Sequence, residues 1–109
     1  MPVTAYVTHE DAILHHLPGH PEHAGRIAQI WEVIDGSPLA ARLKRITPAE
    51  ATTEQVARVH TAEHIDRVKR VAAMGGGMLD PDTYCQEYSE EVARLAAGGV
   101  IAGIDAVLR

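Results

Sequence analysis

The sequence predicts an α/β domain that is mostly helical and contains one or two short strands. Apolar residues recur at helical spacing in several segments, and two short runs favour extended backbone. The chain has 109 residues, of which 46% are apolar, and this suits one globular domain better than a disordered segment. No repeat, low-complexity tract or linker divides it. We therefore expect one structural unit over residues 1–109.

The N-terminal segment predicts a strand followed by an irregular loop. Residues 3–8 combine Val, Thr and Tyr, which favour extended backbone. Residues 10–18 are rich in histidine, and Pro18-Gly19 is a turn signal. The loop should leave the carboxyl end of the strand, where ligands of α/β sheets usually bind.

Two helices are expected next. Pro21 suits the first position of a helix, because its missing N–H would have no helical partner there. Gly36 should end this helix in the left-handed conformation, and Ser37-Pro38 begins a short second helix through Arg42. The apolar face of the first helix comprises Ile27, Ile30, Trp31 and Ile34.

The middle of the chain combines a strand signal with two capped helices. Leu43–Thr47 is the second strand candidate. Thr52 and Gln55 have the spacing of a capping box and predict a brief helix. Thr61 can cap a longer helix, which the triplet Gly75-Gly76-Gly77 should end. The apolar face of this longer helix comprises Ile65, Val68 and Ala72.

The C-terminal third predicts a turn and a long helix. Residues 80–83, Asp-Pro-Asp-Thr, form turns by composition. Ser89 is a good helix start, and the acidic residues after it, Glu90 and Glu91, suit the positive end of the helix dipole. The helix should run to about Leu108. Its small residues would let another backbone approach closely: Ala96, Ala97, Gly98, Gly99, Ala102 and Gly103.

Charge and cysteine content argue against several classes of function. The formal charge of −5 gives no basic surface for the phosphates of nucleic acid. The single cysteine, Cys85, cannot form an internal disulfide and should be a small buried side chain, so we expect a reducing, cytoplasmic location. The N-terminus lacks the pattern of a secretory signal. The longest uncharged run, Leu95–Ile104, is too short to span a bilayer, so no membrane association is expected.

Histidines near the N-terminus are candidate metal ligands. Imidazole is the commonest protein ligand of zinc, but a structural zinc usually has four ligands, often thiolates, and this loop has no cysteine. The two interpretations are a structural zinc site and a set of solvated or hydrogen-bonded side chains. The residues concerned are His9, His15, His16, His20 and His23.

A second pattern, His60-x-x-Glu63-His64, matches the inverted zincin motif. In that motif two histidines hold zinc and the glutamate activates water. Thr61, however, should cap the following helix and leave His60 outside it, and no third ligand follows in a recognisable context. The alternative is a helix start whose histidines are surface or packing residues.

Four segments, residues 20–27 (His-Pro-Glu-His-Ala-Gly-Arg-Ile), 59–65, 75–84 and 95–99, carry a family resemblance. Together and in this order they resemble the zinc-dependent histone deacetylase family, which includes acetoin-utilisation proteins and acetylpolyamine amidohydrolases. The first segment is most similar to the class IIa branch. The resemblance implies an arginase-like three-layer α/β fold, of which residues 1–109 would be the N-terminal portion, a single incomplete domain.

The resemblance also implies roles for four residues. His20 would lie in the entry loop, and Arg26 would line the channel through which acetate leaves. Asp82, or Asp80 in the alternative register, would accept hydrogen bonds from substrate amides at the pocket rim. From the residues alone, Arg26 could be a solvated helix charge, and either aspartate could be a turn residue that bonds its own backbone. Residues 86–88, Gln-Glu-Tyr, depart from the family's usual Ser-Pro-Gly-like segment.

The family's zinc ligands, catalytic histidine pair and carbonyl-polarising tyrosine follow later in the polypeptide. The resemblance therefore assigns no catalytic residue and no metal ligand to this chain. We expect the N-terminal segment of a zinc-dependent deacetylase that acts on acetyl-lysine or acetylated amines. Its partner would be the remainder of the domain, zinc would be bound only in the complete enzyme, and the chain alone should be inactive.

The alternative is a free-standing, non-catalytic helical interaction module. The last helix has an apolar face that would lack its usual cover, and exposed apolar patches drive association. A homodimer is therefore expected for the isolated chain. The face comprises Val92, Leu95, Val100, Ile104 and Val107.

Overall fold

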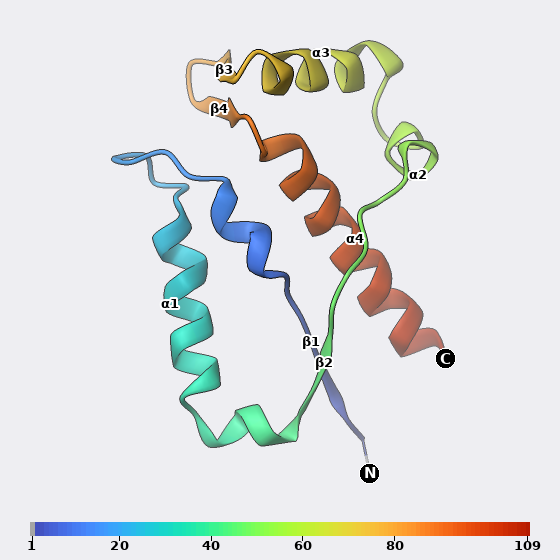
Figure 1. Ribbon diagram of the computed structural model, residues 1–109. Coiled ribbons are helices and arrows are strands. Elements are labelled where there is room, and N and C mark those ends of the chain that lie inside the picture. The colour runs from blue at the N-terminus through green and yellow to red at the C-terminus, as the bar shows by residue number, and fades with distance from the viewer. Residues whose placement is uncertain (1) are drawn as a thin grey trace.

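The computed structural model describes residues 2–109 as a mixed α/β arrangement in which helices predominate (Figure 1). This confirms the predicted fold class, although four short strands replace the expected one or two. In chain order the elements are β1 (Thr4–Val7), the 3₁₀ helix η1 (Glu10–Leu14), α1 (Ala24–Asp35), the 3₁₀ helix η2 (Pro38–Arg42), β2 (Leu43–Ile46), α2 (Thr53–Ala57), α3 (Ala62–Ala73), β3 (Gly76–Asp80), β4 (Thr83–Gln86) and α4 (Ser89–Leu108).

Both predicted strands form and pair with each other. β1 and β2 are parallel, with Thr4 opposite Leu43 and Val7 opposite Ile46. The connection between them runs through α1 and η2, as a parallel pair requires. The indole N–H of Trp31 donates to the Thr8 hydroxyl at 2.7 Å, which ties α1 to the end of β1.

The β3–β4 hairpin is an element that the sequence patterns did not predict. Its strands are antiparallel, with Gly76 opposite Gln86 and an irregularity between Met78 and Asp80. The turn that joins them falls at the predicted Asp-Pro-Asp-Thr segment. At Gly76 φ is +116°, and an added Cβ would lie 2.7 Å from the Cys85 carbonyl oxygen, so this position requires glycine.

Local capping signals place α2 and α3 correctly. The Thr52 hydroxyl accepts the Gln55 N–H at 3.1 Å, and the Gln55 side chain accepts the Thr52 N–H at 2.9 Å, which completes the predicted capping box. The Thr61 hydroxyl accepts the His64 N–H at 3.1 Å. His60 therefore precedes the first turn of α3, as expected.

Two predictions about α1 are wrong. The helix begins at Ala24, not at Pro21, because Nδ1 of His23 accepts the Gly25 N–H at 3.1 Å and makes His23 the N-cap. Gly36 has φ −84° and not the left-handed conformation, because the chain continues directly toward η2. The predicted short helix there is confirmed, with the Ser37 hydroxyl accepting the Leu39 N–H.

Among the small residues of α4, Gly98 admits another backbone, as predicted, whereas Gly99 and Gly103 face side chains. Gly98 is buried where residues 49–51 cross the helix, and an added Cβ would lie 1.8 Å from the Ala49 carbonyl oxygen. The Ala51 N–H donates to the Arg94 carbonyl at 2.9 Å and fixes this crossing. The link between β2 and α2 is thereby held against α4.

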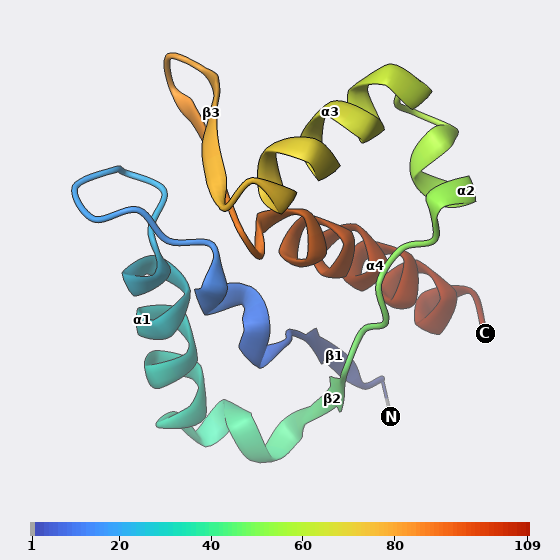
Figure 2. The ribbon, with the colours of Figure 1, turned by 45° about the horizontal axis from the view of Figure 1, so that its top comes forward.

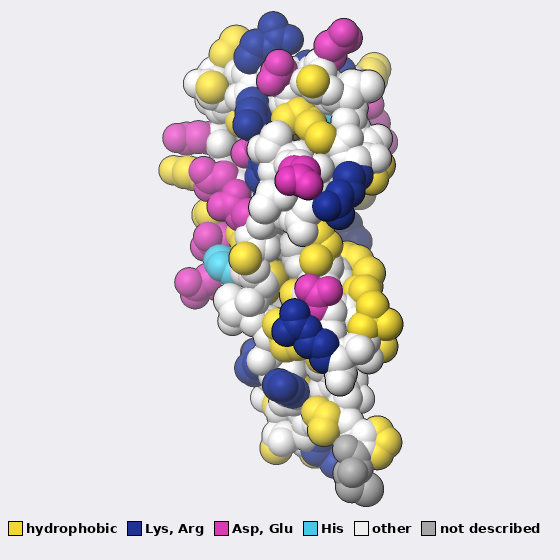
Figure 3. All heavy atoms as spheres, turned by 90° about the vertical axis from the view of Figure 1, so that its right-hand side faces the viewer, with side chains coloured by type: hydrophobic (Ala, Val, Ile, Leu, Met, Phe, Trp, Pro, Cys, Tyr) yellow, Lys and Arg dark blue, Asp and Glu magenta, His cyan; other side chains and the backbone are white. Residues whose placement is uncertain are grey.

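Little of the chain is fully enclosed. The buried apolar side chains are Pro48, Ala51, Ile65, Ala72, Tyr84 and Cys85. The predicted apolar face of α4 divides: Val92 and Leu95 are half-buried, whereas Val100, Ile104 and Val107 are 64%, 53% and 84% exposed. Figure 3 shows hydrophobic side chains at the surface of the face that lies on the right in Figure 1. Between residues 2 and 109, none of the helices combines the length and apolarity needed to cross a bilayer.

Candidate entry-loop site

The histidine-rich segment between η1 and α1, residues 15–23, is here called the entry loop, after the role that the family resemblance implies for His20. It lies against the β3–β4 hairpin, which is distant in the sequence (Figure 2). Near its start, the His16 N–H donates to the side-chain oxygen of Gln86 at 3.0 Å. Near its end, the Tyr84 hydroxyl donates to the Glu22 carbonyl at 2.5 Å. β4 therefore holds the loop at two points.

Tyr84 is the centre of this contact. Its side chain is buried, and its ring stacks on His15 with the centroids 4.2 Å apart and the planes 6° apart. The His20 ring meets it nearly at right angles, with the centroids 4.9 Å apart. Burial, and secondarily the Glu22 carboxylate, raises the pKa of Tyr84, so the phenol stays protonated and remains a donor.

His15 links the loop to the start of α4. Its Nδ1 lies 2.6 Å from the Ser89 hydroxyl oxygen, which also accepts the Gln86 N–H at 2.7 Å. α4 begins at Ser89, as predicted, but Tyr88 occupies the N-cap position and no side chain caps the helix. The Ser89 hydroxyl instead contacts Gln86 and His15. Burial lowers the pKa of His15, although the Glu22 carboxylate opposes the shift.

The structure brings together two of the predicted site residues, His20 and Asp82. Nδ1 of His20 accepts the Glu22 N–H at 3.0 Å, so Nε2 of the neutral ring carries the proton. Nε2 lies 3.0 Å from the Asp82 carbonyl oxygen, to which it donates, and 3.4 Å from the Asp82 carboxylate. The Asp82 side chain is 95% exposed and can accept hydrogen bonds from a ligand.

The other candidate aspartate, Asp80, is engaged in the turn. Its carboxylate accepts the Asp82 N–H and the Thr83 hydroxyl, each at 2.9 Å. These two bonds lower the pKa of Asp80, because they favour the charged form. The turn interpretation therefore describes Asp80, whereas Asp82 presents a carboxylate to solvent.

The histone deacetylase domain matches residues 20–109 of the chain. The chain belongs to the histone deacetylase family. The family match begins at His20 and includes the β3–β4 turn with Asp82, which are two of the segments that carried the resemblance. Residues 15–19 of the entry loop lie before the matched region.

Individual deacetylase-family proteins are similar to this chain but much longer. A probable deacetylase of Methanothermobacter thermautotrophicus is 38% identical over 96 residues, which cover 88% of this chain and 28% of the relative. A histone deacetylase-like amidohydrolase of Pseudomonas aeruginosa is 39% identical over 90 residues, 83% of this chain and 24% of the relative. The crystal structure of the HDA15 HD domain superposes with a TM-score of 0.82 at 32% identity, over 89% of this chain and 29% of that one. The chain thus spans less than a third of each.

The histidine side chains of this deacetylase-family chain are not arranged to bind a metal ion in the part of the chain that the structure describes. Across residues 2–109, no group of three or more His, Cys, Asp or Glu side chains is arranged to hold one. Nδ1 of His9 accepts the Asp11 N–H at 3.0 Å, and Nδ1 of His16 accepts the Ala24 N–H at 2.9 Å. The ring centroids of His60 and His64 lie 5.0 Å apart, and among residues 2–109 no third side chain completes a metal site with them. The described residues therefore do not fit the family's zinc.

Two further residues that the sequence singled out stand apart from this cluster. Arg26 lies in the first turn of α1 with its side chain exposed, and its channel role stays a prediction. Cys85 is buried as expected, and burial raises the pKa of its thiol.

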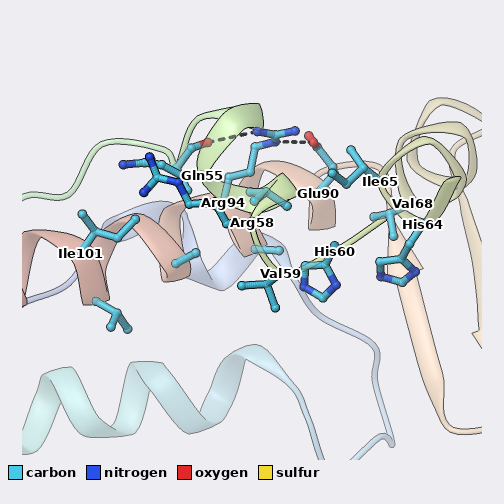
Figure 4. A pocket seen from close by; sticks show the side chains of 15 residues that line it. Gln55, Arg58, Val59, His60, His64, Ile65, Val68, Glu90, Arg94 and Ile101 are labelled. Atoms are coloured by element: carbon cyan, nitrogen blue, oxygen red, sulfur yellow. Dashed lines mark hydrogen bonds and ion pairs between the residues drawn. The ribbon is translucent and has the colours of Figure 1, made fainter. Parts of the chain in front are cut away.

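A separate hollow of about 630 Å³ lies between α2, α3 and α4 (Figure 4). Val59, His60 and His64 are among the residues that line it. Arg94 pairs with Glu90 at 2.5 Å and donates to the Ala51 carbonyl at 3.0 Å, the two contacts drawn as dashed lines. Sequence reasoning missed this hollow, although Ala93 and Ala97 on α4 mark where it would form.

Proposed function

We propose that this chain forms the entry-loop side of the substrate pocket in a zinc-dependent deacetylase. The enzyme would hydrolyse the acetyl amide of acetyl-lysine or of an acetylated amine. The observation that carries this proposal is the contact between His20 and Asp82, made within a chain of the histone deacetylase family. It joins the entry loop to a turn whose exposed carboxylate can bind the N–H groups of a substrate.

The proposed division of labour follows from what these residues can do. Asp82 would accept hydrogen bonds from backbone amides beside the acetylated side chain, and His20 would hold the turn in place. Arg26 would line the acetate channel once the remainder of the domain packs against α1. The zinc ligands and the groups that move protons would belong to that remainder, so the chain alone would not catalyse deacetylation.

The test is the substitution Asp82→Asn in the longest native polypeptide that contains this chain. For an acetyl-lysine peptide, kcat/KM should fall roughly 10-fold or more, because a hydrogen bond to a charged group contributes about 1.5–3 kcal/mol. For an acetylated amine that has neither peptide amides nor further charged groups, kcat/KM should stay near the wild-type value. The exposed Asp66 of α3 provides the matched control, Asp66→Asn. Unchanged peptide kinetics in the Asp82 variant would contradict the rim role.

A second candidate function is a free-standing, non-catalytic helical interaction module. The exposure of Val100, Ile104 and Val107 favours it, because an uncovered apolar face promotes association. The intact mass of the native gene product separates the two proposals. A mass well above 11.8 kDa supports the deacetylase, whereas a mass near 11.8 kDa supports the module.

A further inference from the structure

We infer that Tyr84 is a positioning residue: together with His15 it clamps the entry loop onto β4 and holds His20 against Asp82. This inference rests on the proposed function, because the rim that the clamp positions is the one proposed for substrate. The clamp itself is a property of the contacts between the loop and the hairpin, and it can be tested without any activity.

The first part of the clamp is the Tyr84 side chain. The His15 and His20 rings both pack against it, one stacked and one nearly perpendicular, while its hydroxyl donates to the Glu22 carbonyl. The chain on either side of the loop's tip is therefore fixed by a single buried residue. Tyr84 lies in β4, two positions after Asp82. The residue that holds the entry loop therefore directly follows the turn that carries Asp82.

The second part is a chain of hydrogen bonds near the start of the loop. The Ser89 hydroxyl oxygen accepts the Gln86 N–H, and its proton can be donated to Nδ1 of His15. The side-chain oxygen of Gln86 accepts the His16 N–H. The loop is thus tied at His16 and at Glu22, and only five residues lie between these two ties.

Those five residues include a tight turn, in which the His20 N–H donates to the Leu17 carbonyl at 3.1 Å and Gly19 has φ +83°. A short segment that is tied at both ends has few conformations available to its side chains. The clamp therefore restricts where the His20 ring can lie, and through His20 it restricts the Asp82 turn.

The clamp also depends on the protonation of His15. The groups that face this ring are the Glu22 carboxylate, with 3.6 Å from Nε2 to the nearest oxygen, the Ser89 hydroxyl, the Tyr84 ring and His20. Burial lowers the pKa of His15, so the folded protein binds fewer protons than the unfolded chain just below about pH 6.5. The contribution of neutral His15 is present above that pH and is lost as the pH falls through the folded pKa.

The first experiment measures amide hydrogen exchange in the purified protein. Tyr84→Phe removes the hydroxyl and keeps the ring, and the matched control is Tyr88→Phe, since Tyr88 is 44% exposed. Exchange in residues 15–23 should become about 3- to 10-fold faster in Tyr84→Phe, while α3 keeps its wild-type rates and reports that the variant is folded. A second variant, Ser89→Ala, should loosen the same residues. Wild-type exchange of the loop in both variants would overturn the clamp.

A spectroscopic and a kinetic readout distinguish positioning from simple stability. By NMR, His15 should titrate below its ordinary pKa in the wild type and shift upward toward it in Ser89→Ala. In the native deacetylase, Tyr84→Phe should raise KM for an acetyl-lysine peptide about 3- to 10-fold and change kcat less than twofold. Faster loop exchange with unchanged KM would overturn the positioning role. Faster loop exchange in a native protein that lacks deacetylase activity would leave the clamp standing and refute the proposed function.

Discussion

Gly98 is the residue at which an added methyl group would meet the most resistance. Its Cβ would lie 1.8 Å from the Ala49 carbonyl oxygen, which is backbone and cannot rotate away. Gly98→Ala should therefore push residues 49–51 off α4 and disturb the bond from the Ala51 N–H to Arg94. We expect a loss of at least about 1–3 kcal/mol in the free energy of unfolding, measured by urea denaturation.

The control for this prediction is Gly103→Ala on the same helix. There an added Cβ would make only an ordinary contact, 3.9 Å from a methyl group of Val7. Alanine should stabilise the helix by up to about 1 kcal/mol relative to glycine. Equal effects of the two substitutions would show that helix propensity, and not close backbone approach, governs Gly98.

At the same scale, the sequence indicated two aspartates as candidates for the pocket rim but could not show which carboxylate would be exposed to a ligand. Asp80 and Asp82 both suit a turn, and only the folded hairpin shows that Asp80 accepts the turn's own hydrogen bonds. Similarly, Ser89 is recognisable in the sequence as a helix start, but the contact of its hydroxyl with His15 is not. His15 and Ser89 are 74 residues apart in the sequence, so no local pattern could predict that their side chains would form a hydrogen bond.

At the scale of elements, the features that were predicted correctly are those with local causes. The caps of α2 and α3 form between residues three positions apart, so their spacing is visible in the sequence. The β3–β4 hairpin was missed because β3 begins with two glycines, which have low strand propensity, and its partner strand is only four residues long. The start of α1 was misplaced because a histidine cap outweighed the proline signal.

The capping box of α2 allows a direct test of these local causes. Thr52→Ala removes the acceptor for the Gln55 N–H at the start of a helix of five residues. The protein should lose about 1 kcal/mol of unfolding free energy, measured by urea denaturation followed by circular dichroism. Thr53→Ala is the matched control, because Thr53 is exposed and lies inside the helix. A loss as large in the control would indicate that the cap contributes nothing of its own.

At the scale of the whole molecule, the chain is extended and thinly covered. Its dimensions are 46 × 33 × 18 Å, and within residues 2–109 no large side chain is fully buried. Both pairs of strands have only two members, so their outer edges carry backbone groups without a strand partner. These properties agree with a chain that matches only 29% of a solved deacetylase domain, and they predict low stability for the isolated protein.

The same incomplete cover leads to the last prediction, which concerns association. Val100, Ile104 and Val107 are spaced to lie along one side of α4, and fully burying such a side chain contributes about 1.5–3 kcal/mol. The purified chain should therefore form a homodimer through this face, observed by sedimentation velocity over a range of concentrations. Ile104→Lys should give monomers, because a buried dimer contact cannot accommodate an unpaired ammonium group.

Val33→Lys serves as the control for association, because Val33 is 61% exposed and belongs to α1, which lies apart from α4 in Figures 1 and 2. It should leave the dimer intact. A wild-type chain that stays monomeric at high concentration would rule out the homodimer. In a longer native deacetylase, the rest of the domain would cover the face first, so Ile104→Lys should instead lower the melting temperature of a protein whose oligomeric state is unchanged.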